Sequence, residues 1–563
     1  MRRPPRGDWP RWGGSNWVNM VSGEVGLPNE VGPGTLTREG DSAKLDRSTA
    51  RHLKWAAPLG MPGGSGVCYT SPAVAGGRVY IGCDGSIYDE RFIFPKDYFR
   101  KPMNGRRKRA ALLCLDEATG RFLWQYNIPA NNYASIPGGA HRTGVCATPA
   151  VEGDRLYFTG YQNEVICADV RGQADGNQGP FLDEKLFLAQ LDPADIKQIR
   201  PLQELKPTDV DIIWMYHIPR ELGIRYDAAA ASSPLVHNGR VYVGTNIGVA
   251  DGGPKDHKES LTPDGPALIV LDEKTGRLLA TEDEGIARRV QHGSWSPPSL
   301  VSVNGKPLVV FGGGDRFVYA FDPEPRPGRA RRYPVPRWEA PGSEILPKFA
   351  GDAVTIPAEV GILKCVWKFD ANGDNTASYT WRGSNMDMPG AVIGTPVVWE
   401  NRVFVNVGVD WAYRCRGLMS CYDATGTGDI SKTGRVWLCD DIERSCSTPA
   451  VHDGLVYTGD YTGKVRCVDA ATGQLLWSHP MRGAIHGSPL VADGKVYIGS
   501  SGGDLAILRA GRELRVLCSA AFPGKIESTP VAANGVLYVP TSTMLFAFQR
   551  QDARRDGGNP HGE

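Results

Sequence analysis

Short apolar runs separated by turn residues recur along most of this chain, and near its end the same order returns every 40 or 41 residues. In the least interrupted copy, residues 448–451, 454–457, 465–469 and 472–477 read as four short strands. Each run is only a few residues long and is rich in β-branched side chains and Tyr. Four strands in each repeat predict the blades of a β-propeller.

A Ser-Pro or Thr-Pro pair opens every copy. The eight anchor prolines are Pro72, Pro149, Pro234, Pro297, Pro396, Pro449, Pro489 and Pro530. Earlier copies are the same unit with insertions. The pattern therefore predicts an all-β fold, an eight-bladed propeller of four-stranded antiparallel blades.

The last copy, residues 529–549, has no outer strand after it. An outer-strand signature, Leu53-Lys54-Trp55, stands alone before the first copy. We expect this N-terminal strand to complete the last blade and close the ring, because closure removes exposed sheet edges. The predicted organisation is an extended segment over 1–52, the propeller over 53–550 and a disordered tail over 551–563.

Composition agrees with one large β body, since 69 Gly and 42 Pro supply many turns. The formal net charge of +1 indicates no nucleic-acid partner. Eight minimal blades need only about 350 residues, so the rest must lie in insertions and ends. Loop and helical insertions are expected near 84–110, 171–210, 246–266 and 323–366, with a helical stretch around 184–205, and we expect function in such loops.

The Asp, Thr-Gly and Trp of the repeat recur at Asp116, Thr119-Gly120 and Trp124. The Asp is expected to cap its turn, and the Trp to cover the seam with the next blade. Four cysteines stand two residues before the strand-end Asp of their blades, which predicts a repeated buried position; they are Cys114, Cys167, Cys421 and Cys467. Whether Cys415 pairs with Cys421, or Cys439 with Cys446, is left open by spacing alone.

No stretch approaches the roughly 20 apolar residues of a membrane helix. The leader Met1–Arg6 has no apolar core after it, so the chain is either cytoplasmic or exported with its signal removed. The basic run 100–109 would suit an anionic surface, but a solvated hairpin tip is the favoured interpretation.

One set of residues stands three positions before the anchor prolines: Tyr69, Cys146, Ala231, Ser294, Ile393, Cys446, His486 and Glu527. The first strand of each blade lines the channel of a propeller, so these residues should share one level near its mouth. Cys446, His486 and Glu527 come from consecutive blades and would make a zinc or iron ligand set. The alternative is plain polar lining. His292 and Trp295 are further candidates for the mouth.

A Gly-rich turn begins at Asp175 and includes Asn177. Alternating oxygen side chains on such a turn would bind calcium. The turn lacks the spacing and the terminal Glu of a helix-loop-helix calcium loop, so an Asx turn that caps a helix is the favoured interpretation.

The repeat at 465–477 resembles that of the pyrroloquinoline quinone (PQQ) enzymes and of the propeller that scaffolds outer-membrane protein assembly. The segments 8–14, 175–177, 292–296 and 312–315 resemble more closely the bacterial PQQ-binding-like β-propeller repeat proteins, within the quinoprotein alcohol dehydrogenase-like superfamily. The resemblance implies an exported, periplasmic protein. It is specific for architecture and not for chemistry.

Two function classes follow. A quinone-dependent dehydrogenase would hold PQQ with calcium and oxidise an alcohol or sugar, with Trp295, His292 and Asp315 as cofactor-binding candidates. The resemblance would then imply an adjacent cysteine pair, which the sequence lacks, and a base that nothing selects among Asp315, Asp410 and Asp460. The preferred class is a binding or scaffold propeller whose loops hold a protein partner or small-molecule ligand on one face of the ring. No hydrolase motif is present.

Overall fold

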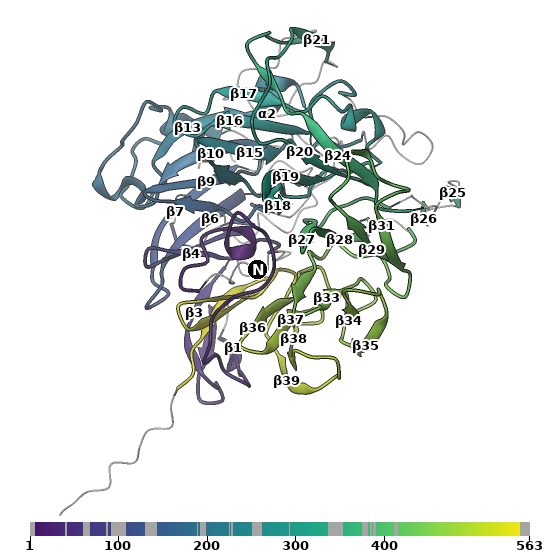
Figure 1. Ribbon diagram of the computed structural model, residues 1–563. Helices are drawn as coiled ribbons and strands as arrows, with labels where there is room; N and C mark the ends of the chain where they lie inside the picture. Colours follow the sequence, from purple (N-terminus) through teal and green to yellow (C-terminus); the bar gives the residue numbers. More distant parts are fainter. Residues whose placement is uncertain are drawn as a thin grey trace, which may run out of the picture.

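The fold is a ring of eight four-stranded antiparallel blades (Figure 1). The computed structural model describes residues 6–39, 42–59, 68–85, 88–89, 91, 109–129, 144–188, 190–191, 199–224, 226, 229–249, 260, 262–291, 293–335, 353–373, 381–382, 385–386, 390–409 and 415–551. The all-β, eight-bladed prediction is confirmed.

Each blade runs from an innermost strand at the channel to an outermost strand at the rim. Blades one to four are β4 Ala73–Ala75, β5 Arg78–Cys83, β6 Arg109–Asp116 and β7 Phe122–Pro129; β8 Ala150–Glu152, β9 Arg155–Thr159, β10 Glu164–Asp169 and β13 Ile212–His217; β14 Leu235–His237, β15 Arg240–Gly244, β16 Leu268–Asp272 and β17 Leu278–Thr281; and β18 Ser299–Val303, β19 Lys306–Gly312, β20 Phe317–Phe321 and β24 Cys365–Asp370.

The second half of the ring repeats this order. Blades five to eight are β27 Val397–Trp399, β28 Arg402–Val407, β29 Leu418–Asp423 and β31 Arg435–Cys439; β32 Ala450–His452, β33 Leu455–Gly459, β34 Lys464–Asp469 and β35 Leu475–Pro480; β36 Leu490–Ala492, β37 Lys495–Gly499, β38 Asp504–Arg509 and β39 Val516–Ala521; and β40 Val531–Ala533, β41 Val536–Pro540, β42 Met544–Phe548 and β3 Leu53–Pro58.

Insertions add short elements outside this frame. Small hairpins pair β1 Thr35–Glu39 with β2 Ser42–Asp46, β11 Gln190–Leu191 with β12 Ile199–Arg200, β21 Arg331–Pro334 with β22 Ala353–Ile356, and β25 Trp381–Arg382 with β26 Asn385–Met386. β23 Gly361–Ile362 and β30 Gly428–Asp429 extend blades three and four in parallel. The short helices are η1 Trp12–Gly14, η4 Gly172–Asp175, α1 Glu184–Phe187, α2 Ile218–Leu222 and η5 Ile286–Arg289.

The ring closes as predicted. β3 pairs antiparallel with β42, with Leu53 opposite Phe548 and Pro58 opposite Met544. The first blade-forming strand of the chain is therefore the outermost strand of the last blade. This pairing covers an edge of β42 that would otherwise be open.

The prediction of a helical stretch around 184–205 is wrong in its length. Among the residues of this span that the structure describes, α1 alone is helical, and β11 and β12 form an antiparallel pair farther along. Pro201, just after β12, has no N–H to donate to a helical hydrogen bond. The apolar spacing of this insertion serves packing against blade two instead, because Phe187 and Leu202 lie in its core.

The repeated Asp and Trp have distinct roles at the blade seams. Asp469 Oδ1 accepts hydrogen bonds from Thr472 N and Thr472 Oγ1, both at 3.0 Å. The turn that Asp469 caps ends at Gly473, whose missing Cβ would lie 2.6 Å from the ring of Trp437 in the preceding blade. Trp437 Nε1 also donates to Ala470 O at 3.1 Å. Each turn is thereby packed against its neighbour.

The predicted burial of the repeated cysteines is confirmed. All four are buried in the blade sheets; they are Cys114, Cys167, Cys421 and Cys467. The twelve cysteines of the chain are thiols rather than disulfides, including Cys415, Cys439 and Cys446. A small apolar side chain at this position fits the narrow space between blades.

From its first described residues, the N-terminal segment makes a circuit over one end of the channel, near the centre of the ring (Figure 1). We call residues 7–24 the cap. Its backbone and side chains bond to the innermost strands or the residues just before them, at Val74, Val151, Val236, Leu300, Thr395, Val451, Val491 and Ala532. The cap thus contacts every blade.

The innermost strands are sheet edges, and the cap forms hydrogen bonds with their open backbone groups. Val74 N and Val74 O both bond to Trp9 at 2.8 Å, and Val491 N bonds to Met20 O at 2.8 Å. Without the cap these buried backbone groups would have no sheet partner. The predicted extended segment over 1–52 therefore includes a structural lid, which sequence reasoning did not anticipate.

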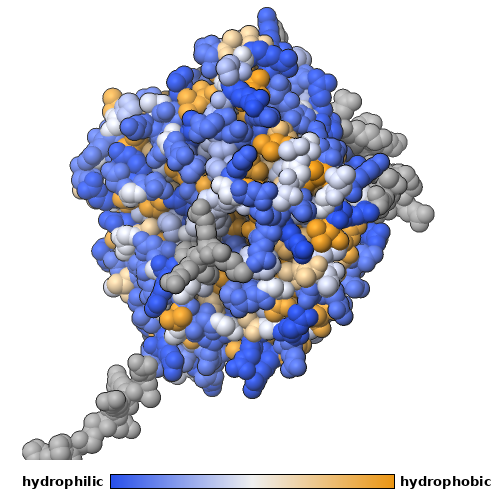
Figure 2. Space-filling view, viewed as in Figure 1, coloured by the Kyte–Doolittle hydropathy of each residue, from blue (hydrophilic) through white to orange (hydrophobic). Residues whose placement is uncertain are grey.

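The face that carries the cap is mostly hydrophilic, with small scattered hydrophobic groups (Figure 2). Large continuous apolar patches usually mark docking surfaces, and this view has none outside its grey atoms. No helix among the described residues is long and apolar enough to cross a membrane.

Candidate functional site: the central cavity

A cavity of about 230 Å³ lies on the axis of the ring. Residues from the cap and from every blade line it: Trp12, Tyr69, Cys146, Thr148, Ala229, Ala231, Ser233, Trp295, Pro297, Ile393, Gly394, Cys446, Thr448, Tyr461, His486, Gly487, Ser488, Glu527, Ser528 and Thr529. Trp12 belongs to the cap, and its Nε1 donates to Thr395 Oγ1 at 2.9 Å. The cap therefore walls the cavity at one end of the channel.

A belt of hydroxyl groups surrounds the cavity and explains the Ser/Thr-Pro anchors. The backbone N–H of Thr448 donates to Ser488 Oγ in the next blade at 2.9 Å, and Ser488 N donates to Thr529 Oγ1 at 2.8 Å. Thr529 N continues the belt to Ser71 Oγ across the seam where the ring closes. The Ser or Thr before an anchor proline thus ties neighbouring blades together, and five of these residues also line the cavity: Thr148, Ser233, Thr448, Ser488 and Thr529.

The residues three positions before the anchor prolines gather at this cavity. Those that line it are Tyr69, Cys146, Ala231, Ile393, Cys446, His486 and Glu527. Ser294, the remaining member of the set, is fully buried, and its neighbour Trp295 reaches the cavity instead.

Aromatic rings enclose the imidazole of His486. The Tyr461 ring meets it edge-on with centroids 5.1 Å apart, and the Tyr69 ring does so at 6.2 Å. Cys446 Sγ lies 2.8 Å from Tyr461 Oη. The guanidinium of Arg444 stacks behind Tyr461 at 5.4 Å from the ring centroid. This side of the cavity therefore combines aromatic surface with a thiol and a titratable ring.

Glu527 brings a carboxylate to the same wall. It is 5% exposed, and its Oε1 lies 3.8 Å from His486 Nδ1 and 3.7 Å from Lys525 Nζ. Burial raises the pKa of Glu527, and the charge of Lys525 opposes that rise. Glu527 Oε2 and the nearby Ser528 Oγ are buried without a hydrogen-bond partner. Such polar atoms in a cavity wall are suited to bind a ligand.

The structure brings Cys446, His486 and Glu527 to one cavity but does not cluster them as ligands. Within the described ranges, no three His, Cys, Asp or Glu side chains are placed to hold a metal ion. Cys446 contacts Tyr461 instead. The zinc or iron site remains a prediction, while the polar-lining alternative matches these contacts.

The residues predicted to bind a cofactor do not lie together at the cavity. Trp295 lines the cavity, but Asp315 lies inside blade four, where its Oδ2 accepts hydrogen bonds from Tyr319 Oη at 2.6 Å and Arg289 Nε at 3.1 Å. Burial raises the pKa of Asp315, and the bonds from Tyr319 and Arg289 oppose that rise. Asp315 does not line the cavity. His292 lies outside the described residues, as does Asp410.

The Gly-rich turn of blade two meets two acids that sequence reasoning missed. Asp175 pairs with Arg171 at 3.0 Å, and Asn177 Nδ2 donates to Glu184 Oε2 at 3.0 Å. Asp211, just before β13, is also buried there. Burial, reinforced by the charge of Glu184, raises the pKa of Asp211 to about 7. No spacing rule connects residues 177, 184 and 211, so only the fold could reveal this group.

Parts of the predicted insertions lie outside the described residues. These are 92–108 with most of the basic run, 192–198, 250–259, 336–352 and the tail 552–563. The interpretations of the basic run and of the tail therefore stay predictions.

Known proteins resemble this chain both in sequence and in fold. The profile of a PQQ-repeat family described as outer membrane protein assembly factor BamB matches residues 69–178 and 416–514. A europium-containing methanol dehydrogenase superposes with a TM-score of 0.51 at 10% identity, covering 97% of this chain and 98% of that chain. The chain is a PQQ-like β-propeller. BamB from Moraxella catarrhalis has a TM-score of 0.43 at 13% identity, covering 79% and 90%.

Curated relatives of this PQQ-like propeller include two alcohol dehydrogenases. The quinone alcohol dehydrogenase subunit of Gluconobacter oxydans (strain 621H) is 28% identical over 26% of this chain and 18% of its own length. Quinohemoprotein alcohol dehydrogenase ADH-IIG of Pseudomonas putida is 29% identical over 22% and 18%. The similarity thus spans less than a fifth of either relative and does not decide the activity.

The cavity of this PQQ-like propeller does not fit the quinone. PQQ is a tricarboxylate, yet the described lining contains no Lys or Arg. It presents instead the buried carboxyl of Glu527, which would repel an anion unless protonated. No two cysteines are adjacent in the sequence. We therefore derive no chemical step through PQQ.

Proposed function

We propose that this protein is a binding propeller whose central cavity takes a small neutral or cationic molecule. The observation that carries the proposal is the cavity itself, walled by Trp12 of the cap and lined by aromatic rings, hydroxyls and the buried Glu527. Ligand sites are typically concave and apolar with a few placed polar groups. In line with the family resemblance, we propose that it acts outside the cytoplasm.

The lining favours this ligand class through two kinds of contact. Tyr69, Tyr461 and Trp295 offer aromatic faces that bind cations or the apolar faces of sugars. Glu527 Oε2 and Ser528 Oγ offer polar atoms that need a hydrogen-bond partner. A ligand that donates hydrogen bonds would satisfy both.

The inserted loops suggest a second binding role, toward a protein partner. Propeller loops converge on the faces of the ring, and insertions are placed to contact partners. We propose that the loops near 84–110, 171–210, 246–266 and 323–366 hold a protein partner, so that the propeller works as a scaffold. Crosslinking and mass spectrometry of the purified protein in extract from its native compartment would identify these contacts.

Titration with defined probes tests the cavity. Trp12 and Trp295 line it, so binding should change tryptophan fluorescence. We expect methylammonium or glucose to produce a saturable change, and Glu527→Gln to weaken the methylammonium response by about tenfold, since one charge-assisted hydrogen bond contributes on the order of 1.4 kcal/mol. Glu513→Gln, at an exposed position in blade seven, is the matched control.

A quinone-dependent dehydrogenase is the second candidate, favoured by the similarity to alcohol dehydrogenases. The same titration separates the two functions. Stoichiometric binding of PQQ, with dye reduction by an alcohol, would replace the binding proposal. A response to the neutral or cationic probes alone would support it.

A further inference from the structure

Two acids in blade two are completely buried beneath the insertion that begins at η4. Glu184, the first residue of α1, and Asp211, the residue before β13, are both 0% exposed. Carboxylates are rarely buried so fully unless they are paired or bind a metal. Each of these two carboxylates should therefore have a partner that compensates its charge.

One loop holds both carboxylates by one oxygen each. Asn177 Nδ2 donates to Glu184 Oε2 at 3.0 Å, and Gln178 N donates to Asp211 Oδ2 at 3.1 Å. Because Asn177 and Gln178 are consecutive, the two carboxylates converge on one point of the loop. Their second oxygens, Glu184 Oε1 and Asp211 Oδ1, are buried with no hydrogen-bond partner.

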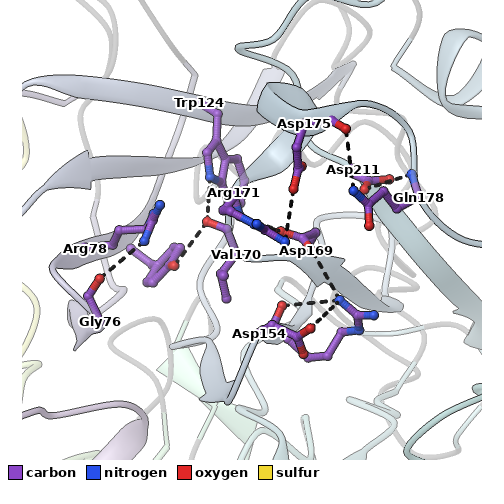
Figure 3. A network of polar contacts seen from close by, with 12 residues as sticks. Gly76, Arg78, Trp124, Asp154, Asp169, Val170, Arg171, Asp175, Gln178 and Asp211 are labelled. Carbon is purple, nitrogen blue, oxygen red and sulfur yellow. Dashed lines mark hydrogen bonds and ion pairs between the residues drawn. The ribbon is translucent and has the colours of Figure 1, made fainter.

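The surrounding charges do not compensate this pair. Figure 3 shows Arg171 between Asp169 and Asp175, which it contacts at 3.4 and 3.0 Å. Asp169 also pairs with Arg155 at 3.2 Å. In the described part of the chain, no Arg, Lys or His forms an ion pair with Glu184 or Asp211. The basic residues here are taken up by other acids.

We propose that Glu184 Oε1 and Asp211 Oδ1 bind a calcium ion beneath residues 177–178. Two carboxylate oxygens supply the hard anionic ligands that calcium prefers, and carbonyl oxygens or waters can complete its flexible coordination. The ion would neutralise charges whose burial is otherwise costly. It would also clamp α1 and the 175–180 loop onto the start of β13, so its role is structural and independent of the cavity ligand.

Calcium binding is tested on the full chain after treatment with a chelator and dialysis. Equilibrium dialysis with calcium chloride should give one ion per chain at this site. The melting temperature should rise with calcium, because a ligand that binds only the folded state stabilises it. Magnesium chloride at equal concentration should raise it less, since magnesium demands a stricter octahedral geometry.

Asp211→Asn is the decisive variant. Asn keeps an oxygen for the Gln178 N–H and removes one buried charge. In chelator it should therefore melt at or above the wild-type temperature, while in calcium it should melt below, with calcium affinity reduced at least about tenfold. A merely destabilising substitution would lower melting in both conditions.

Glu282→Gln is the matched control. Glu282 is a buried carboxyl whose oxygens both accept backbone hydrogen bonds, from Ala267 N at 2.8 Å and Glu284 N at 2.6 Å. It should lower stability without changing the response to calcium. Wild-type melting that is identical in calcium and chelator, or unchanged calcium affinity in Asp211→Asn, would overturn the proposal and indicate that a proton neutralises the pair.

Discussion

At the scale of the residue, the seams between blades depend on glycines that face a tryptophan. Gly473 has φ +77°, and a Cβ there would lie 2.6 Å from Trp437. Gly454 has a similar φ of +73°, but a Cβ there would meet nothing within 4 Å. An alanine would therefore be strained in its backbone at both positions, but it would clash with a neighbour only at position 473.

Gly473→Ala should destabilise the protein more than Gly454→Ala. The backbone term is about 1 kcal/mol in both, and the displaced Trp437 ring should add about 1–3 kcal/mol at Gly473 only. Chemical denaturation of both variants measures the difference. Equal loss in the two would show that the Trp437 contact is easily rearranged.

A buried acid gives the protein a measurable pH dependence. Glu164 is 0% exposed, and it accepts a hydrogen bond from the Tyr126 hydroxyl. Burial raises the pKa of Glu164 from 4.5 to about 7. The folded state then holds a proton that the unfolded state loses above pH 4.5, so this group's contribution to stability falls as pH rises toward 7.

Glu164→Gln should flatten this dependence. The shift corresponds to about 3 kcal/mol between pH 4.5 and pH 7, and Gln cannot titrate. Denaturation at several pH values should show a smaller decline for the variant, with the remainder coming from acids such as Asp211. The exposed Glu359→Gln should keep the wild-type slope; if Glu164→Gln keeps it as well, Glu164 is ionised throughout.

At the scale of the element, the cap is a single segment that contacts the inner ends of all eight blades. The amides of Val74, Val151 and Val491 donate to the cap carbonyls of Trp9, Pro10 and Met20, each at 2.8 Å. A net contribution of about 1 kcal/mol for each such bond makes the cap a substantial part of the stability of the channel wall.

Deletion of residues 1–26 should remove the cap and leave β3 in place. We expect a folded ring with lower melting temperature, because the inner edges lose their partners. Hydrogen exchange should quicken at the amides of Val74, Val151 and Val491, while Tyr80 in the interior of blade one stays protected. Unchanged protection at the three amides would contradict the role given to the cap.

At the scale of the whole molecule, the ring is closed by strands from distant parts of the chain. β3 supplies the outermost strand of the last blade, with Trp55 Nε1 bonded to Glu117 O in the first blade at 2.9 Å. β3 and β42 come from opposite ends of the chain, so no continuous stretch of backbone connects the two strands at this point of the ring. Closure depends on non-covalent contacts, which include the β3–β42 pairing and the bond from Thr529 N to Ser71 Oγ.

Deletion of residues 1–57 should be far more damaging than deletion of 1–26. The longer deletion removes almost all of β3 and leaves β42 as an open edge, which favours aggregation. Size-exclusion chromatography and melting of the two variants compare them directly. A monomeric protein with the melting temperature of the shorter deletion would mean that ring closure does not need β3.

The sequence by itself determined the architecture, because each blade is a local unit. The spacing of Ser/Thr-Pro, Asp469, Thr472-Gly473 and Trp477 repeats within about 40 residues, and neighbouring strands pair within that distance. The unpaired signature around Trp55 was enough to predict closure. The ring of residues at the cavity followed from the same repeat, since equivalent positions in a propeller lie at one level.

Only the tertiary structure decided what closes the channel and where charge is buried. The cap follows no repeat, and its partners lie up to about 500 residues away in sequence, as with Ser22 and Ala532. Glu184 and Asp211 lie close together because an insertion folds back on β13. Asp315 does not line the cavity, because hydrogen bonds from Arg289 and Tyr319 hold its side chain inside blade four. Such contacts depend on which surfaces the assembled blades bring together, and no local pattern encodes them.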